Sequence, residues 1–84
     1  MILTIVETNE ILFLTNLPPT VTEDALATLF RQYAGFKEVR IVPGKTDIAF
    51  AEYSTAAQAE TARNILNGFL LSATHKLGIA FARR

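Results

Sequence analysis

The stretch Ile48–Tyr53 reads IAFAEY and decides the fold, because its side chains alternate between two kinds of surface. Successive side chains of a β-strand project to opposite sides, so one set faces a core and the other faces away. The inward set is predicted to be Ala49, Ala51 and Tyr53. The outward set is predicted to be Ile48, Phe50 and Glu52. This stretch therefore predicts a strand with one buried face and one open face.

A second strand is expected at residues 11–15, which read ILFLT. The same alternation places Leu12 and Leu14 toward the core, and Phe13 and Thr15 on the opposite face. Both strands thus offer a phenylalanine to the face that is not buried.

Two helices are predicted from their capping residues and their apolar spacing. Thr22 suits the start of the first helix, because a threonine side chain accepts a hydrogen bond from a free N–H in the first turn. Leu26, Leu29 and Phe30 then share one helical face. The second helix is expected to begin at Thr55, and the pair Asn67-Gly68 to end it.

Further strands at residues 37–42 and 77–81 complete the order β-α-β-β-α-β, with residues 69–76 as a loop. This order predicts an α+β fold, the ferredoxin-like split β-α-β-β-α-β sandwich, with a four-stranded antiparallel sheet and two helices on one face. Right-handed crossovers place the first and third strands in the middle. The predicted core consists of Leu12, Leu14, Leu26, Leu29, Phe30, Val39, Ile41, Ala49, Ala51, Tyr53, Ala59, Ala62, Leu66 and Ile79.

Length and composition exclude several classes of protein. The chain has 84 residues, which suits one small domain, and we expect residues 1–9 to be an apolar leader or linker and residues 10–84 to be the domain. No cysteine and a single histidine exclude a disulfide framework and a thiolate or multi-histidine metal site. No apolar run approaches the roughly 18 residues of a membrane span, so no membrane partner is expected. Eight basic and eight acidic residues cancel, which predicts few phosphate contacts.

The feature of the open face that most needs an explanation is the pair Phe13 and Phe50. Their strands are predicted to be neighbours, so the two rings lie side by side and exposed. Paired aromatic rings on an open sheet commonly stack unpaired bases of single-stranded nucleic acid. Ordinary cross-strand packing of two aromatic residues is the alternative interpretation.

These residues carry a resemblance to a known family. Residues 12–17 (LFLTNL) resemble the RNP2 motif of the RNA recognition motif family, and residues 46–53 (TDIAFAEY) resemble its RNP1 motif. The strings at residues 11–18, 35–40, 42–44 and 47–50 further resemble the C-terminal RNA recognition motif of the spliceosomal A and B-double-prime proteins of small nuclear ribonucleoproteins. The resemblance implies a nuclear RNA-binding module of the spliceosome.

The RNP1 motif departs from the family pattern at three positions. A basic residue and glycine usually open it, and here Thr46 and Asp47 stand there. Its third position is usually aromatic and here is Ile48, so one of three stacking rings is missing. Stacking contributes about 1–3 kcal/mol per base, so we expect weak binding of single-stranded RNA. The predicted RNA-binding residues are Phe13, Thr15, Arg40, Ile48, Phe50 and Arg83.

Two other functions remain as alternatives. One is a protein-interaction or scaffold domain, with a spliceosomal protein as partner, that keeps this fold and has largely lost RNA binding. The other is an enzyme of the acylphosphatase type, which would need an arginine and a phosphate-binding loop after the first strand; residues 16–20 (NLPPT) offer neither, so no enzyme, cofactor or metal is predicted.

A further hypothesis concerns where the apolar residues of the leader lie. Ile2, Leu3, Ile5 and Val6 have no place in the helix-side core. They are expected to fold over the open face or to pair along a sheet edge, and in either case to compete with RNA. The alternative is a disordered terminus.

Overall fold

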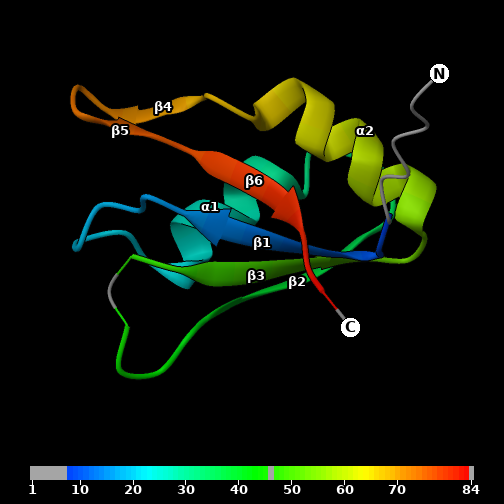
Figure 1. The fold of residues 1–84 in the computed structure, drawn as a ribbon, viewed down its shortest axis with the longest axis horizontal. Helices are drawn as coiled ribbons and strands as arrows, with labels where there is room; N and C mark the ends of the chain where they lie inside the picture. Colours follow the sequence, from blue (N-terminus) through cyan, green and yellow to red (C-terminus); the bar gives the residue numbers. More distant parts are fainter. Residues whose placement is uncertain (1–7, 46, 84) are drawn as a thin grey trace, which may run out of the picture.

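The computed structural model describes residues 8–45 and 47–83, and the hypothesis about residues 1–6 lies outside them. These residues form six strands and two helices, which are labelled in Figure 1. They are β1 (Ile11–Thr15), α1 (Glu23–Phe30), β2 (Phe36–Ile41), β3 (Ala49–Tyr53), α2 (Ala56–Leu66), β4 (Leu70–Ser72), β5 (His75–Lys76) and β6 (Gly78–Phe81).

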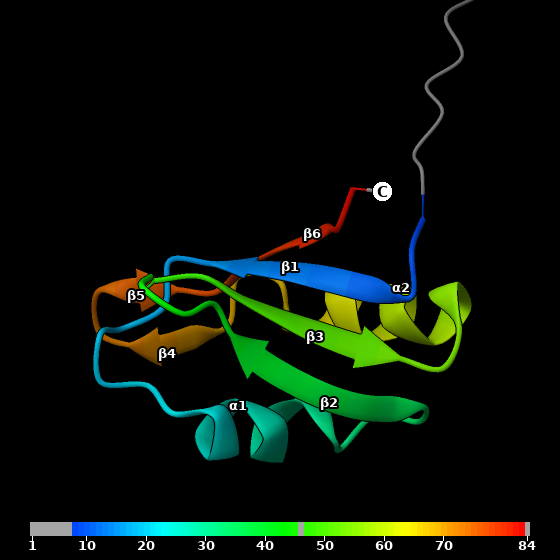
Figure 2. The same cartoon turned by 90° about the horizontal axis from the view of Figure 1, so that it is seen from below.

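Four of the strands form an antiparallel sheet in the order β2-β3-β1-β6. The first and third strands, β1 and β3, are central, as the crossover rule predicted. Both helices lie on the same side of this sheet, and the other side is left without a helix (Figure 2). The predicted fold class is confirmed.

The helices begin where their caps predict. The Thr22 side chain accepts a hydrogen bond of 3.1 Å from the backbone N–H of Ala25, and Thr55 does the same for Gln58. The second helix ends before Gly68, whose φ of 87° lies in the left-handed region that glycine adopts without strain. No helix in the described part of the chain is long and apolar enough to cross a membrane.

The core lies between the helices and the sheet. Its fully buried residues are Leu12, Leu14, Leu17, Leu26, Phe30, Ala49, Ala51, Tyr53, Ala59, Ala62, Leu66, Leu77 and Ile79. Leu29, Val39 and Ile41 were expected among them and are only half-buried. Val39 and Ile41 belong to β2, which is an edge strand, and Leu29 belongs to α1, which packs against that edge. Leu17 and Leu77 are additional members, from the connections that flank β1 and β6.

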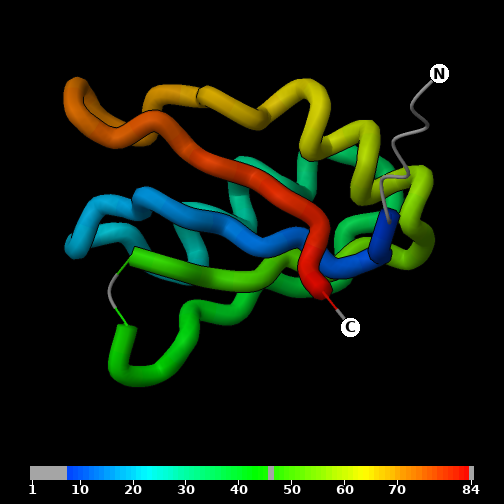
Figure 3. The backbone as a smooth tube through the Cα atoms, viewed as in Figure 1, coloured from blue at the N-terminus to red at the C-terminus, as the bar shows by residue number. Residues whose placement is uncertain are grey.

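The segment expected to be a loop contains a short hairpin. Strands β4 and β5 pair with each other just before the start of β6, in the orange part of the tube in Figure 3. The Asn16 side chain donates a hydrogen bond of 2.9 Å to the Lys76 carbonyl, and it does so from a backbone φ of 61°. The hairpin is therefore tied to the turn after β1, a contact far apart in sequence that local pattern does not reveal.

Candidate nucleic-acid interface

The sheet face opposite the helices displays its side chains in rows that run across the strands. Strand pairing sets Arg40 beside Phe50, Phe50 beside Phe13, and Phe13 beside Ala80. We call these four residues the aromatic row. The next row toward the chain termini, the acidic row, consists of Glu38, Glu52, Ile11 and Ala82.

The aromatic row places two rings at the centre of the open face. The centroids of Phe13 and Phe50 are 5.4 Å apart and the ring planes meet at 45°. Phe50 is 37% exposed and Phe13 is half-buried beside it. Ala80 and Gly78 on β6 are too small to cover the rings, so a planar apolar group can reach them from solvent. The predicted aromatic pair is thus present as a platform.

Thr15 and Ile48 lie at the opposite end of this platform from the acidic row. Both are half-buried, and alternation keeps Ile48 on the same face as Phe50. The Thr15 hydroxyl donates a weak hydrogen bond of 3.4 Å to the Gly78 carbonyl. A Cβ at Gly78 would collide with that hydroxyl, so Thr15 packs closely over the glycine. These two predicted residues border the platform and add no cation to it.

Two cations near the platform, Arg40 and Lys37, are paired with carboxylates. The Arg40 guanidinium lies 3.4 Å from Glu38 Oε1, and Lys37 Nζ lies 3.6 Å from Glu52 Oε2. Lys37 reaches Glu52 because a β-bulge between Phe36 and Glu38 turns it onto the open face. Two ion pairs therefore offset the positive charge of Arg40 and Lys37 on the open face.

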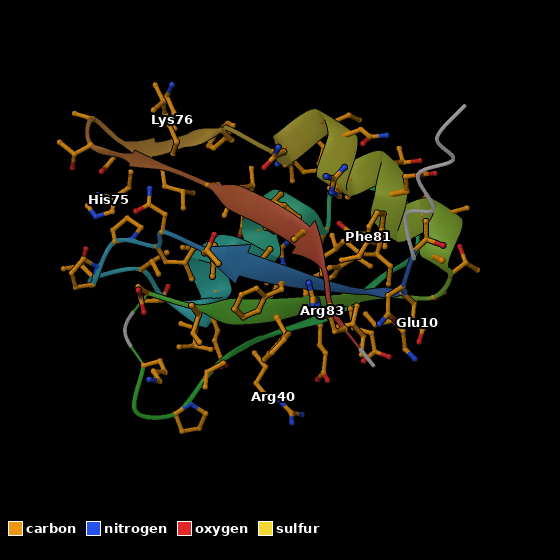
Figure 4. The ribbon with its side chains drawn as sticks, in the orientation of Figure 1. Glu10, Arg40, His75, Lys76, Phe81 and Arg83 are labelled. Carbon is orange, nitrogen blue, oxygen red and sulfur yellow. The ribbon has the colours of Figure 1, made fainter. Side chains whose placement is uncertain are left out.

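Arg83 follows β6, where the chain passes in front of the sheet in the view of Figure 4. Together with Ala82 it borders a groove of about 460 Å³ on the open face. The groove is lined by Asn9, Ile11, Glu38, Arg40, Phe50, Glu52, Ala82 and Arg83. Three of the predicted site residues, Arg40, Phe50 and Arg83, thus meet around one depression.

Asn9 fixes the position of this C-terminal wall. Its side-chain N–H donates a hydrogen bond of 2.9 Å to the Ala82 carbonyl, and its Oδ1 accepts one of 3.2 Å from the backbone of Ile11. Asn9 is only 4% exposed, although residues 1–9 were expected to form the leader. Sequence reasoning missed it because its partner Ala82 lies 73 residues away.

The described residues contain no group of three or more metal-ligating side chains. His75 accepts or donates hydrogen bonds within the hairpin, to Ser72 and Thr74, away from the open face.

An aromatic platform on the helix-free face of a four-stranded sheet, in this strand order, is characteristic of a class of RNA-binding domains. The RNA recognition motif family matches residues 12–75. The chain belongs to the RNA recognition motif family.

Particular relatives narrow this assignment. The chain is 50% identical over 76 residues to U1 small nuclear ribonucleoprotein A of Drosophila melanogaster, across 90% of this chain and 35% of that protein. It is 43% identical over 76 residues to U2 small nuclear ribonucleoprotein B'' of Arabidopsis thaliana, across 90% of this chain and 33% of that protein. The predicted resemblance is confirmed, and the chain spans about a third of the length of these relatives.

A solved structure is also similar to this chain in fold and in sequence. The MEC-8 C-terminal RRM domain bound to AGCACA superposes with a TM-score of 0.76 at 34% identity, and the match covers 88% of this chain and 90% of that one.

Proposed function

We propose that this domain binds single-stranded RNA by stacking bases on Phe13 and Phe50, as a module of a spliceosomal ribonucleoprotein in the nucleus. The observation that carries the proposal is the exposed ring pair at the centre of the open face. The relatives support it, since two are small nuclear ribonucleoproteins and the MEC-8 domain is bound to AGCACA. Thr15, Ile48, Arg40 and Arg83 complete the proposed contact surface.

The same surface favours weak binding. Phosphate contacts supply much of the affinity for nucleic acid, and Arg40 is already ion-paired with Glu38. Ile48 provides no ring for a third base. We therefore expect a dissociation constant weaker than about 10 μM at physiological salt.

A titration of isotope-labelled protein with a mixed pool of short single-stranded RNAs tests the proposal through backbone amide shifts. We expect shifts at Phe13, Ile48 and Phe50, and Phe50→Ala should weaken binding roughly 5- to 150-fold, because stacking contributes about 1–3 kcal/mol per base.

The matched control is Phe69→Ala. Phe69 is also an exposed phenylalanine, 45% accessible, but it follows α2 in the connection to β4. Its loss should leave the affinity unchanged. Tight binding by the unmodified domain that survives Phe50→Ala would contradict both the site and the expected weakness.

A protein-interaction or scaffold domain is the second candidate, with a spliceosomal protein as the partner. It is supported by Ile65, Phe69 and Leu70, three large apolar side chains exposed around the end of α2. Exposed apolar patches of this kind often mark protein contacts. This candidate predicts that the RNA pool leaves the amide shifts of the open face unchanged. Neither candidate involves catalysis.

A further inference from the structure

The acidic row borders the groove beside Phe50, and the stacking described above does not use its carboxylates. We propose that Glu52, together with Glu38, selects a base with an exocyclic amino group, and so prefers cytosine to uracil, next to the base stacked on Phe50. This inference rests on the proposed function and names the class of base that the same site accepts.

The geometry brings an aromatic wall and two carboxylates to one depression. Glu52 lies two residues after Phe50 on the same face of β3, and strand pairing sets Glu38 directly opposite Glu52. Both glutamates and Phe50 line the groove of about 460 Å³, which is within the roughly 300–1,000 Å³ of small-ligand sites. The apolar side chain of Ile11 lies in the same lining. A base that leaves the ring of Phe50 in this direction therefore meets the two carboxylates.

The carboxylates have acceptor capacity left. The ion pair with Arg40 uses Oε1 of Glu38, and the ion pair with Lys37 uses Oε2 of Glu52. Each side chain keeps a second oxygen, and an ionised carboxylate can only accept hydrogen bonds. Cytosine offers an N4 amino donor where uracil carries the O4 acceptor. A carboxylate that faces this position attracts cytosine and repels uracil.

The charges around the groove favour a base over a phosphate or a cationic peptide. Two carboxylates opposite each other repel phosphate, so the nucleic-acid backbone is expected to stay at the rim. Arg83 borders the groove and is available to phosphate at that rim, and the charges of Arg40 and Arg83 oppose a cationic peptide. Asn9 holds Ala82 in place through a 2.9 Å hydrogen bond, so the wall that carries Arg83 is fixed before RNA binds.

Hexamers of cytidine and uridine test the inference, because the two pyrimidines differ at the C4 substituent. The measurement is the dissociation constant from amide shifts of the full chain. We expect the cytidine hexamer to bind about 5- to 10-fold more tightly, at the lower end of a base-specific contact since both carboxylates are partly exposed.

The decisive variant is Glu52→Gln. Its amide both donates and accepts, so it can pair with either base, and the ratio of the two dissociation constants should fall to about one. Glu60→Gln is the matched control, because it makes the same charge change at an exposed position of α2 and should preserve the ratio.

The outcomes separate the two claims. Equal binding of both hexamers that Phe50→Ala still weakens would overturn the base preference and leave the proposed function standing. A ratio unchanged in Glu52→Gln would overturn the role of this carboxylate. Absence of any hexamer binding, or groove shifts with a basic peptide alone, would overturn the preference together with the proposed function.

Discussion

The two faces of the sheet are made by alternate residues of the same strands, yet they differ in burial and in chemistry. On the helix side, Leu12, Ala51 and Tyr53 are fully buried. By strand alternation their immediate neighbours Phe13 and Glu52 project to the other side, and no helix lies on that side of the sheet (Figure 2). One residue step along a strand therefore separates a position that holds the fold from a position that can meet a ligand.

The comparison also explains which charges each face tolerates. A carboxylate beneath the helices would be buried without a partner, which is costly. On the open face, Glu38 and Glu52 lie directly opposite each other, and ion pairs with Arg40 and Lys37 offset their repulsion. The open face accepts this arrangement because water screens it. Mutations on the two faces should therefore separate stability from recognition.

The largest expected effect is on the helix side, at Phe30→Ala. Phe30 is fully buried between α1 and the sheet, so its truncation leaves a cavity and should lower the free energy of unfolding by about 3–5 kcal/mol. Urea unfolding monitored by circular dichroism measures this loss. Phe50→Ala removes the same ring from the open face and should cost only about 1–2 kcal/mol, because that ring is already partly solvated. Equal losses of unfolding free energy in the two variants would contradict the difference between the two faces.

The second largest expected effect is on the RNA affinity of the open face. The variant combines Asp47→Gly with Ile48→Phe. Together they restore the glycine and the aromatic residue of the usual RNP1 motif beside Phe50. A third ring should contribute about 1–3 kcal/mol of binding free energy, so RNA affinity should rise by roughly 5- to 150-fold. The same amide-shift titration measures it. An unchanged dissociation constant would mean that Ile48 lies outside the path of the RNA.

The smallest effect concerns the hydroxyl of Tyr53 on the helix side. This hydroxyl donates a hydrogen bond of 2.7 Å to the Phe30 carbonyl in the core. Tyr53→Phe should lower the free energy of unfolding by about 0.5–1.5 kcal/mol near neutral pH. Urea unfolding measures the difference between the two proteins.

The pH dependence of that difference has a definite sign. Burial, and secondarily the nearby Tyr33, raises the pKa of Tyr53 above its usual value of about 10. Above pH 10 the unfolded chain releases this proton while the folded protein keeps it, so stability falls with rising pH by up to about 1.4 kcal/mol per unit. The advantage of Tyr53 over phenylalanine should therefore shrink between pH 9 and pH 11. A constant difference would show that the hydroxyl is not protected by the fold.

Local sequence determined the elements and the faces of the strands. The caps at Thr22 and Thr55 act within one helical turn, and the alternation from Ile48 to Tyr53 follows from strand geometry alone. The pairing of Phe13 with Phe50 also followed, because few topologies fit the order β-α-β-β-α-β and right-handed crossovers place these strands together.

Tertiary structure alone decided the groove and its charges. The hydrogen bond from the Asn9 side chain to the Ala82 carbonyl joins the two ends of the domain. The bulge that turns Lys37 toward Glu52 depends on the register between β2 and β3. The extra burial of Leu17 and Leu77 likewise depends on how the connections fold back over the core. Such contacts arise between residues far apart in the chain, and their geometry is set by packing of the whole domain. Alternation and capping act over a few residues, which is why the sequence by itself determined the platform and not the groove beside it.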